Sequence, residues 1–510
     1  MIPDLLARTL EQFLLESRHG VVVEEGEIIF DLASTRFSVS AERGRCLAQM
    51  WSSERNIVRE VLDAELKKDA LRLSVRKFAQ SRSHTLQIFR ERDQRTAAAR
   101  KTARSSYARL LERILQREFR DWRLAKLSTS MDLERSFSPV YTRGLLRKGR
   151  NALAVIGVNQ QETQASVDAA LTFGLLWLED CRQREAGRST VEGLRIYVPP
   201  KKSDTLRLRM TYLNRQIGRF QLCECHEADG TTKEVELSDP VDLESHLLRC
   251  PDRAHLSSQF AEAIARIKTA APDAEMATPV PGVISFRLNG LEFALVRMGV
   301  LPGTLRAGPE VVFGAAGMEE VLTSENEAAF RGFMRRIAES RVAAGDKRNP
   351  LWRIYPERWL ESLIVKNVTA VDSHLDPSCV YSQVPAFSAS DRSLIDVLTC
   401  TRAGRLAVLE LKADEDIHLP VQGLDYWARV RWHHARGEFQ KSGYFSNVQL
   451  LSESPQLFLV APALRVHPAV ETILRYFSLN IEWTLVGIDE RWREGIKVVF
   501  RKAAAKVAST

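Results

Sequence analysis

Two carboxylates and a lysine occur within a short stretch of the chain that reads as a hairpin. Two apolar runs flank Arg402-Ala403-Gly404 in the segment that extends from Asp396 to Lys412. A three-residue loop with glycine in the left-handed conformation fits this sequence. If residues 402–404 form the loop, we predict that Asp396 on the first strand lies opposite Glu410 on the second.

This pairing has chemical consequences. Opposed residues of an antiparallel pair have Cβ atoms about 4.5 to 5.5 Å apart, and like charges there destabilise the sheet. Lys412 follows Glu410 by two residues and therefore shares its face of the strand. Carboxylate oxygens suit Mg²⁺, which binds proteins through one or two carboxylates together with substrate phosphate oxygens. Lys412 would orient or deprotonate an attacking water and stabilise charge on the phosphate.

These residues occur in an order that resembles a known family. Asp396, then Glu410-Leu411-Lys412, then Gln422-Gly-Leu-Asp-Tyr426 resembles the Asp…Glu-x-Lys…Gln-x-x-x-Tyr signature of PD-(D/E)XK nucleases. Upstream, residues 360–367 resemble the helix that begins the catalytic core in the NucS/EndoMS and RecB-like branches. The resemblance covers about residues 350–440, and Ile395 replaces the proline that often gives the family its name.

The resemblance implies a role for each residue. Asp396 and Glu410 would bind Mg²⁺ or Mn²⁺, and Lys412 would be the catalytic lysine. Glu361 would be an auxiliary acidic residue, and Gln422 and Tyr426 would contact the reacting water or the DNA. It also implies a restriction-endonuclease-like α/β core and a metal-dependent nuclease that hydrolyses DNA phosphodiester bonds in DNA repair or defence.

Helical periodicity supports the same placement of the two flanking helices. Pro420 suits the first turn of a helix on which Gln422 and Tyr426 share a face. On the earlier helix Glu357 and Glu361 share a face, so Glu357 is the alternative if Glu361 points away. His433-His434, near the end of the later helix, are expected at the surface.

Positive charge is concentrated in one stretch. Residues 72–126 contain 16 basic and 5 acidic residues, a net charge of +11, while the whole chain carries +8. Apolar residues from Tyr107 to Trp122 recur at steps of three and four, which indicates an amphipathic helix. Basic residues at this density could neutralise successive phosphates, or they could form a solvated helix face. The residues expected to contact nucleic acid are Arg100, Lys101, Arg104, Arg109, Arg113, Arg117 and Arg120.

The remaining pattern predicts an α/β multidomain chain. We expect an N-terminal hairpin that turns at Glu25-Gly26 and a basic, mainly helical region over residues 1–135. A middle α/β domain would span residues 136–345, because strands and helices alternate from about residue 152. The nuclease-like domain would span residues 346–510. No internal repeat is apparent.

Composition limits the class of protein. The chain has 510 residues, of which 45% are hydrophobic and 27% charged, which fits a globular protein of several domains. It contains no apolar run of about 20 residues and no secretion signal, so we expect a cytoplasmic protein without a membrane partner. The seven scattered cysteines are expected to be reduced. Cys223, Cys225, His226, His246 and Cys250 fit buried thiols better than a zinc site, because their spacing is not a standard one.

Several alternatives stay open at this stage. A non-catalytic or partner-activated nucleic-acid-binding subunit could keep the nuclease fold without the activity. RNA is also a conceivable target, because the core reads phosphate geometry. These residues do not determine whether the activity would be that of an endonuclease or of an exonuclease. They also do not determine the substrate structure, the sequence preference or the oligomeric state.

Overall fold

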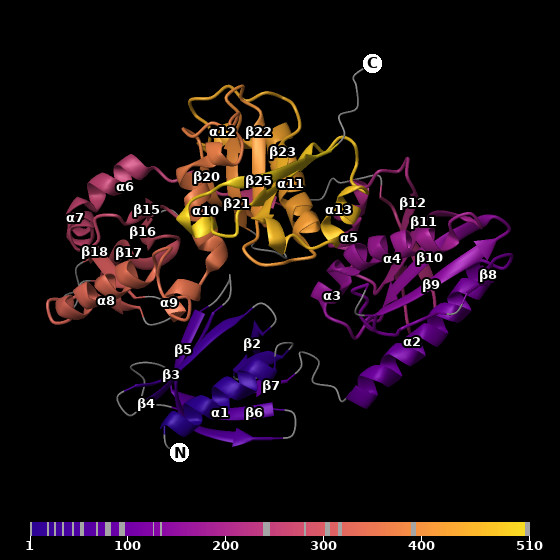
Figure 1. The fold of residues 1–510 in the computed structure, drawn as a ribbon, viewed down its shortest axis with the longest axis horizontal. Coiled ribbons are helices and arrows are strands. Elements are labelled where there is room, and N and C mark those ends of the chain that lie inside the picture. Colours follow the sequence, from indigo (N-terminus) through magenta and orange to yellow (C-terminus); the bar gives the residue numbers. More distant parts are fainter. Residues whose placement is uncertain are drawn as a thin grey trace. The chain divides into compact units, whose positions relative to one another are not determined.

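The computed structural model contains helices and strands along most of the chain (Figure 1). The chain forms two compact units. The structure describes residues 3–504 except 18–19, 25–26, 33–34, 43–44, 52–55, 68–69, 77–82, 91–96, 126, 133–134, 238–244, 280–281, 301–306, 315–318 and 389–393. Unit 1 comprises residues 1–96 and 251–362, and unit 2 comprises residues 97–250 and 363–510. Both units are discontinuous in sequence, and the three continuous domains stay a prediction.

Unit 1 begins with a sheet where mainly helical structure was expected. Helix α1 (Pro3–Glu16) precedes β1 (Val21–Glu24), β2 (Glu27–Asp31), β3 (Arg36–Glu42), β4 (Arg45–Trp51), β5 (Asn56–Leu66), β6 (Ala70–Arg76) and β7 (Ser83–Phe89). These strands form one antiparallel sheet in the order β2-β1-β7-β6-β5-β4-β3. The expectation of mainly helical structure is therefore wrong for the described residues after the hairpin, from β3 to β7.

The period of the buried residues explains this correction. On β6 the side chains of Leu71, Leu73 and Val75 are buried while Arg72 is exposed, which is the two-residue period of a strand. The N-terminal hairpin is confirmed by the antiparallel pairing of β1 with β2, and its turn residues Glu25 and Gly26 lie outside the described residues.

A second antiparallel sheet completes the strands of unit 1. Its strands are β15 (Glu275–Ala277), β16 (Val283–Leu288), β17 (Leu291–Val300), β18 (Ala307–Phe313) and β19 (Glu320–Val321). Its helices are α6 (Arg253–Gln259), α7 (Ala261–Ala270), α8 (Glu327–Ser340), α9 (Pro350–Arg353) and α10 (Pro356–Lys366), the last of which continues into unit 2.

Unit 2 contains two α/β modules, and the first is the middle module. Its strands are β8 (Arg123–Leu124), β9 (Tyr141–Lys148), β10 (Asn151–Val158), β11 (Thr190–Val198), β12 (Arg219–Cys225) and β13 (Thr232–Val235). Its helices are α2 (Ala97–Glu118), α3 (Gln164–Asp168), α4 (Ala170–Glu185) and α5 (Asp204–Thr211). The predicted alternation of strands and helices from residue 152 is thereby confirmed.

The second is the C-terminal module, which carries the predicted catalytic residues. Its strands are β20 (Tyr381–Ser388), β21 (Leu394–Cys400), β22 (Leu406–Leu411), β23 (Gln456–Pro462), β24 (Trp483–Ile488) and β25 (Val498–Ala503). Its helices are α11 (Leu419–Ala435), α12 (Glu438–Lys441) and α13 (Ala469–Leu474), with short 3₁₀ turns η1 (Val368–Ala370), η2 (Ala463–Arg465) and η3 (Trp492–Glu494). The short strand β14 (Ser245–Leu247) adds to the edge of this sheet beside β20.

The two modules have the same topology. In each, the first three strands are antiparallel, a helix leads to a fourth strand parallel to the third, and a second helix leads to a fifth strand parallel to the fourth. A sixth, antiparallel strand closes the sequence in both. The chain therefore contains an internal structural repeat that its sequence does not reveal.

The repeats pack through equivalent helices, because α4 contacts α13 and α11 contacts α5. The join is reciprocal: the Asn214 amide donates to the Tyr476 carbonyl, and the Ser478 amide donates to the Tyr212 carbonyl, both at 2.8 Å. Matching guanidinium groups cover the two tyrosine rings, with Arg431 over Tyr212 and Arg182 over Tyr476. One hydrophobic core runs through both modules.

Helix α2 covers the other face of the middle sheet. Tyr107, Leu111 and Ile114 are buried against residues of β10 and β12, which confirms the amphipathic helix. None of the helices in the described part of the chain combines the length and the apolar character needed to cross a lipid bilayer.

Candidate active site

The hairpin of β21 and β22 has the predicted register. The last residue pair of the ladder toward the open end is Val397 with Leu409, so the next position on each strand is Asp396 and Glu410. At the closed end Gly404 has a φ of 91°, and its amide donates to the Thr401 carbonyl at 2.8 Å. The loop of residues 402–404 therefore sets which carboxylates face each other.

Three polar side chains form a row across the sheet. Asp396 has Glu410 opposite it on β22, and the register of β20 places Gln383 opposite Asp396 on the other side. The Gln383 amide nitrogen lies 3.5 Å from Asp396 Oδ1, and the Leu411 amide donates to Asp396 Oδ2 at 3.1 Å. Gln383 has a φ of 53°, a strained conformation for a residue with a side chain. Sequence periodicity does not signal this residue.

Lys412 lies beside Glu410, as expected. Its Nζ is 3.2 Å from Glu410 Oε1, and the side chains are 14% and 2% exposed, respectively. A carboxylate this deeply buried requires a cation or hydrogen bonds to remain charged. The patch therefore combines two carboxylates with one ammonium group, of which Glu410 is fully buried and Asp396 and Lys412 are partly buried.

Helix α11 brings the next two predicted residues to the same place. A Cβ at Gly423 would come within 2.5 Å of Leu459 Cδ2 and 3.5 Å of Glu410 Cβ, so glycine permits the helix to lie directly over β22 and β23. Gln422 and Tyr426 flank this contact on the helix. The Oε1 atom of Gln422 is buried and makes no hydrogen bond within the described residues.

The electrostatic surroundings of Tyr426 show that it belongs to the cluster. Burial raises the pKa of its hydroxyl well above the ordinary value, and the nearby negative charges of Glu410 and Asp396 raise it further. Lys412 opposes this shift. Tyr426 therefore stays protonated at neutral pH and can donate a hydrogen bond.

Only one of the two repeats carries the acidic pair. On neighbouring parallel strands, Ile156 pairs with Ile196 in the middle module, and Glu410 pairs with Leu459 in the C-terminal module. A Cβ at Gly174 would contact Ile156 and Ile196, and a Cβ at Gly423 would contact Glu410 and Leu459. Ile156 therefore corresponds to Glu410.

Given this correspondence, Arg143, which is opposite Ile156, takes the place of Asp396, and Val158 takes the place of Lys412. The Arg143 side chain is buried and lies over the Phe137 ring, 4.4 Å from its centroid. These positions in the middle module are therefore unsuited to binding a divalent cation.

Glu361 is on α10 and belongs to unit 1, whereas Asp396, Glu410 and Lys412 belong to unit 2. The Glu361 carboxylate is 4% exposed and pairs with Arg358 at 3.1 Å, whereas Glu357 is exposed. Its auxiliary role stays a prediction.

The basic residues of α2 divide into two groups. Arg104 pairs with Glu162 at 3.2 Å, and Arg117 donates to the Gly230 carbonyl at 2.6 Å, so both have structural contacts. Arg100 lies in the helix, but its side chain is outside the described residues. The other predicted contacts on this stretch are exposed: Lys101, Arg109, Arg113 and Arg120.

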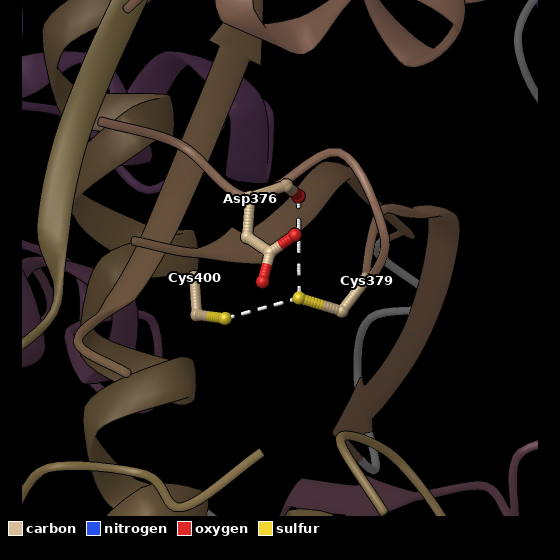
Figure 2. Close-up of side chains that lie close together, drawn as sticks. All are labelled: Asp376, Cys379 and Cys400. Atoms are coloured by element: carbon tan, nitrogen blue, oxygen red, sulfur yellow. Dashed lines mark hydrogen bonds between the residues drawn. The ribbon is translucent and has the colours of Figure 1, made fainter. Parts of the chain in front are cut away.

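The cysteines are free thiols, in agreement with expectation. Cys223 and Cys225 are buried beneath α2 in the core of the middle module. Among the described residues, the one group of at least three His, Cys, Asp or Glu side chains whose donor atoms all lie within 4.8 Å of one another is Asp376, Cys379 and Cys400 (Figure 2), which sequence spacing does not indicate.

Comparison with known proteins gives no relative: no family model, no curated protein and no solved structure matches this chain.

Proposed function

We propose that this chain is a metal-dependent nuclease of the PD-(D/E)XK type that hydrolyses DNA phosphodiester bonds with Mg²⁺ or Mn²⁺. One observation carries the proposal. The register of β21 and β22 continues to Asp396 and Glu410, and Lys412 Nζ is 3.2 Å from Glu410. A restriction-endonuclease-like core is the finer assignment that this arrangement supports.

The donor set fits a hard divalent cation. Asp396 and Glu410 offer carboxylate oxygens, the ligands that Mg²⁺ and Mn²⁺ prefer, and they would hold the ion. A cation there would offset the negative charge that builds up on the phosphate during hydrolysis.

The protein's own residues would perform the remaining tasks. Lys412 would orient the attacking water and donate a hydrogen bond to the phosphate as its charge grows. Tyr426, whose hydroxyl is protonated at neutral pH, would donate a hydrogen bond to the same water or to the DNA. The buried Oε1 of Gln422 would accept a hydrogen bond from the water or from the DNA. The exposed residues of α2 would bind the DNA backbone.

The test compares wild type with Lys412→Ala and Asp396→Asn on single-stranded, double-stranded and branched DNA and on RNA. Each reaction is run with Mg²⁺, with Mn²⁺ and with EDTA. Cleavage should require the metal and fall about a hundredfold or more in both variants. Lys441→Ala and Asp414→Asn, which change exposed residues of the same types, should keep the wild-type rate.

The same assay separates the competing interpretation. DNA binding by wild type without metal-dependent cleavage of any substrate would instead indicate a non-catalytic or partner-activated subunit. Cleavage by Asp396→Asn at the wild-type rate would refute the assignment of the site.

A further inference from the structure

Two thiols meet at the end of the strand that carries Asp396. Cys400 is the last residue of β21, and Cys379 stands shortly before β20. Their sulfur atoms point toward each other and are 3.0 Å apart (Figure 2). Cys400 is fully buried, while Cys379 retains 7% exposure.

The backbone holds these sulfurs together without help from the thiols. The Asp376 amide donates to the Cys400 carbonyl at 2.9 Å, and the Arg402 amide donates to the His374 carbonyl at 2.8 Å. The Asp376 carboxylate in turn accepts from the Ser378 amide and hydroxyl at 2.8 and 2.7 Å. The turn before β20 is thus fixed against the end of β21 at Cys400 and at Arg402.

The sulfur separation favours a covalent bond over a shared metal. Two thiolates on a tetrahedral zinc ion with Zn–S bonds of about 2.3 Å would be about 3.8 Å apart. A disulfide requires about 2.05 Å, which the pair reaches by closing about 1 Å. The third donor, Asp376, is already engaged by Ser378, and structural zinc sites use four ligands.

We propose that Cys379 and Cys400 are a modification site at which hydrogen peroxide oxidises the two thiols to a reversible disulfide. Cys379 attacks the peroxide oxygen, the O–O bond breaks, and one water leaves as Cys379 becomes a sulfenic acid. Cys400 then displaces the hydroxyl group from that sulfur, and the second water leaves. In total, the two thiols lose two protons and two electrons, and hydrogen peroxide takes up both and is reduced to two waters.

The environment assigns the two roles. Cys379 is the more exposed sulfur and can meet the peroxide, whereas Cys400 cannot. The hydrogen bond between the two thiols lowers the pKa of Cys379 and, together with burial, raises that of Cys400. The nucleophilic thiolate therefore forms at Cys379, and Cys400 resolves the sulfenic acid.

Peptide mapping of the full chain tests this directly. Trypsin cleaves after Lys366, Arg392 and Arg402, so each cysteine falls in its own peptide, residues 367–392 and residues 393–402. After hydrogen peroxide treatment of the reduced protein, the two peptides should appear joined, lighter by two hydrogens than their sum. Dithiothreitol should separate them.

Variants identify the order of events. In Cys400→Ser a sulfenic-acid trap such as dimedone should label Cys379, and Cys181→Ser, which removes another buried thiol, should leave the cross-link intact. The peptide map of the wild type does not depend on any variant, so it still tests the proposal if Cys400→Ser fails to fold. Persistently free thiols in peroxide, irreversible oxidation of Cys379 without a cross-link, or one tightly held zinc per chain would each overturn the proposal.

Discussion

Arg209 of α5 and Asp425 of α11 form a two-point ion pair between the modules of unit 2. Arg209 Nε lies 3.0 Å from Asp425 Oδ1, and Nη2 lies 2.7 Å from Oδ2. The side chains are 9% and 16% exposed, and Arg209 also donates to the Asp168 carbonyl at 2.6 Å. Because Asp425 precedes Tyr426, this pair fixes the helix that delivers Gln422 and Tyr426 to the carboxylates.

Removal of one partner should therefore be costly. Arg209→Ala leaves a largely buried carboxylate, so the free energy of unfolding should fall by about 3 kcal/mol. The double variant with Asp425→Ala should lose less than the sum of the two single losses, because no charge is stranded. Urea denaturation of the three variants measures this coupling, and strict additivity would contradict it.

The repeat provides a matched pair of glycines for a test of α11. In Gly423→Ala the new methyl group would meet Leu459 at 2.5 Å, and in Gly174→Ala it would meet Leu194 at 2.9 Å. Overpacking should destabilise both proteins by about 1–3 kcal/mol. Since only α11 carries Gln422 and Tyr426, nuclease rates measured well below the melting temperature should fall in Gly423→Ala alone. Equal rate losses in both would argue against a positioning role for this contact.

The exposed basic residues of α2 should contribute to DNA affinity through phosphates. The association constant for DNA falls as the salt concentration rises, and the slope of its logarithm against log salt concentration should become shallower by about 0.9 for each phosphate contact removed. Arg109→Ala combined with Arg113→Ala should thus reduce the slope by about 1.8, as measured by fluorescence anisotropy over a salt series. Arg188→Ala, an exposed arginine on a turn after α4, serves as the control and should leave the slope unchanged.

The stability of the protein should fall as the pH drops below about 6.5. His433 was expected at the surface but is fully buried, between Ser245 Oγ at 2.9 Å and Glu438 Oε2 at 2.5 Å. Burial lowers its pKa, although Glu438 opposes the shift. As the pH falls through the ordinary histidine pKa of about 6.5, His433 therefore binds a proton in the unfolded chain before it does so in the folded protein. The free energy of unfolding consequently decreases between about pH 6.5 and the lowered pKa of the folded state.

His433→Gln removes the titrating group and keeps a polar side chain. The difference in unfolding free energy between pH 7.5 and pH 5.5 should be smaller in this variant than in wild type. Some dependence should remain, since burial also lowers the pKa of His418. An unchanged difference would show that His433 does not contribute.

Oxidation of the cysteine pair should stabilise the fold. A disulfide between residues 21 positions apart closes a loop in the unfolded chain and lowers the entropy of the unfolded state. It should therefore add about 3 kcal/mol to the free energy of unfolding. Denaturation of peroxide-treated protein with and without dithiothreitol measures the gain. Cys379→Ser, treated in the same way, should show none.

The sequence alone determined the local geometry of the candidate site. A three-residue loop ending in Gly404 fixes how two strands pair, so the register that continues to Asp396 and Glu410 followed from the positions of the apolar runs. The face shared by Gln422 and Tyr426 followed from helical periodicity in the same way. Turn chemistry and periodicity act over a few residues, which is why they can be recognised in the chain itself.

Tertiary structure alone decided which distant segments meet. The sequence separation between Arg209 and Asp425 is 216 residues, and no local pattern encodes their ion pair. The left-handed Gln383, the approach of Cys379 to Cys400 and the reciprocal join of the two repeats have the same origin. The repeat is hidden because its central strands are buried at nearly every position and need only apolar residues, which many sequences supply, so Ile156 and Glu410 can occupy equivalent places in one topology.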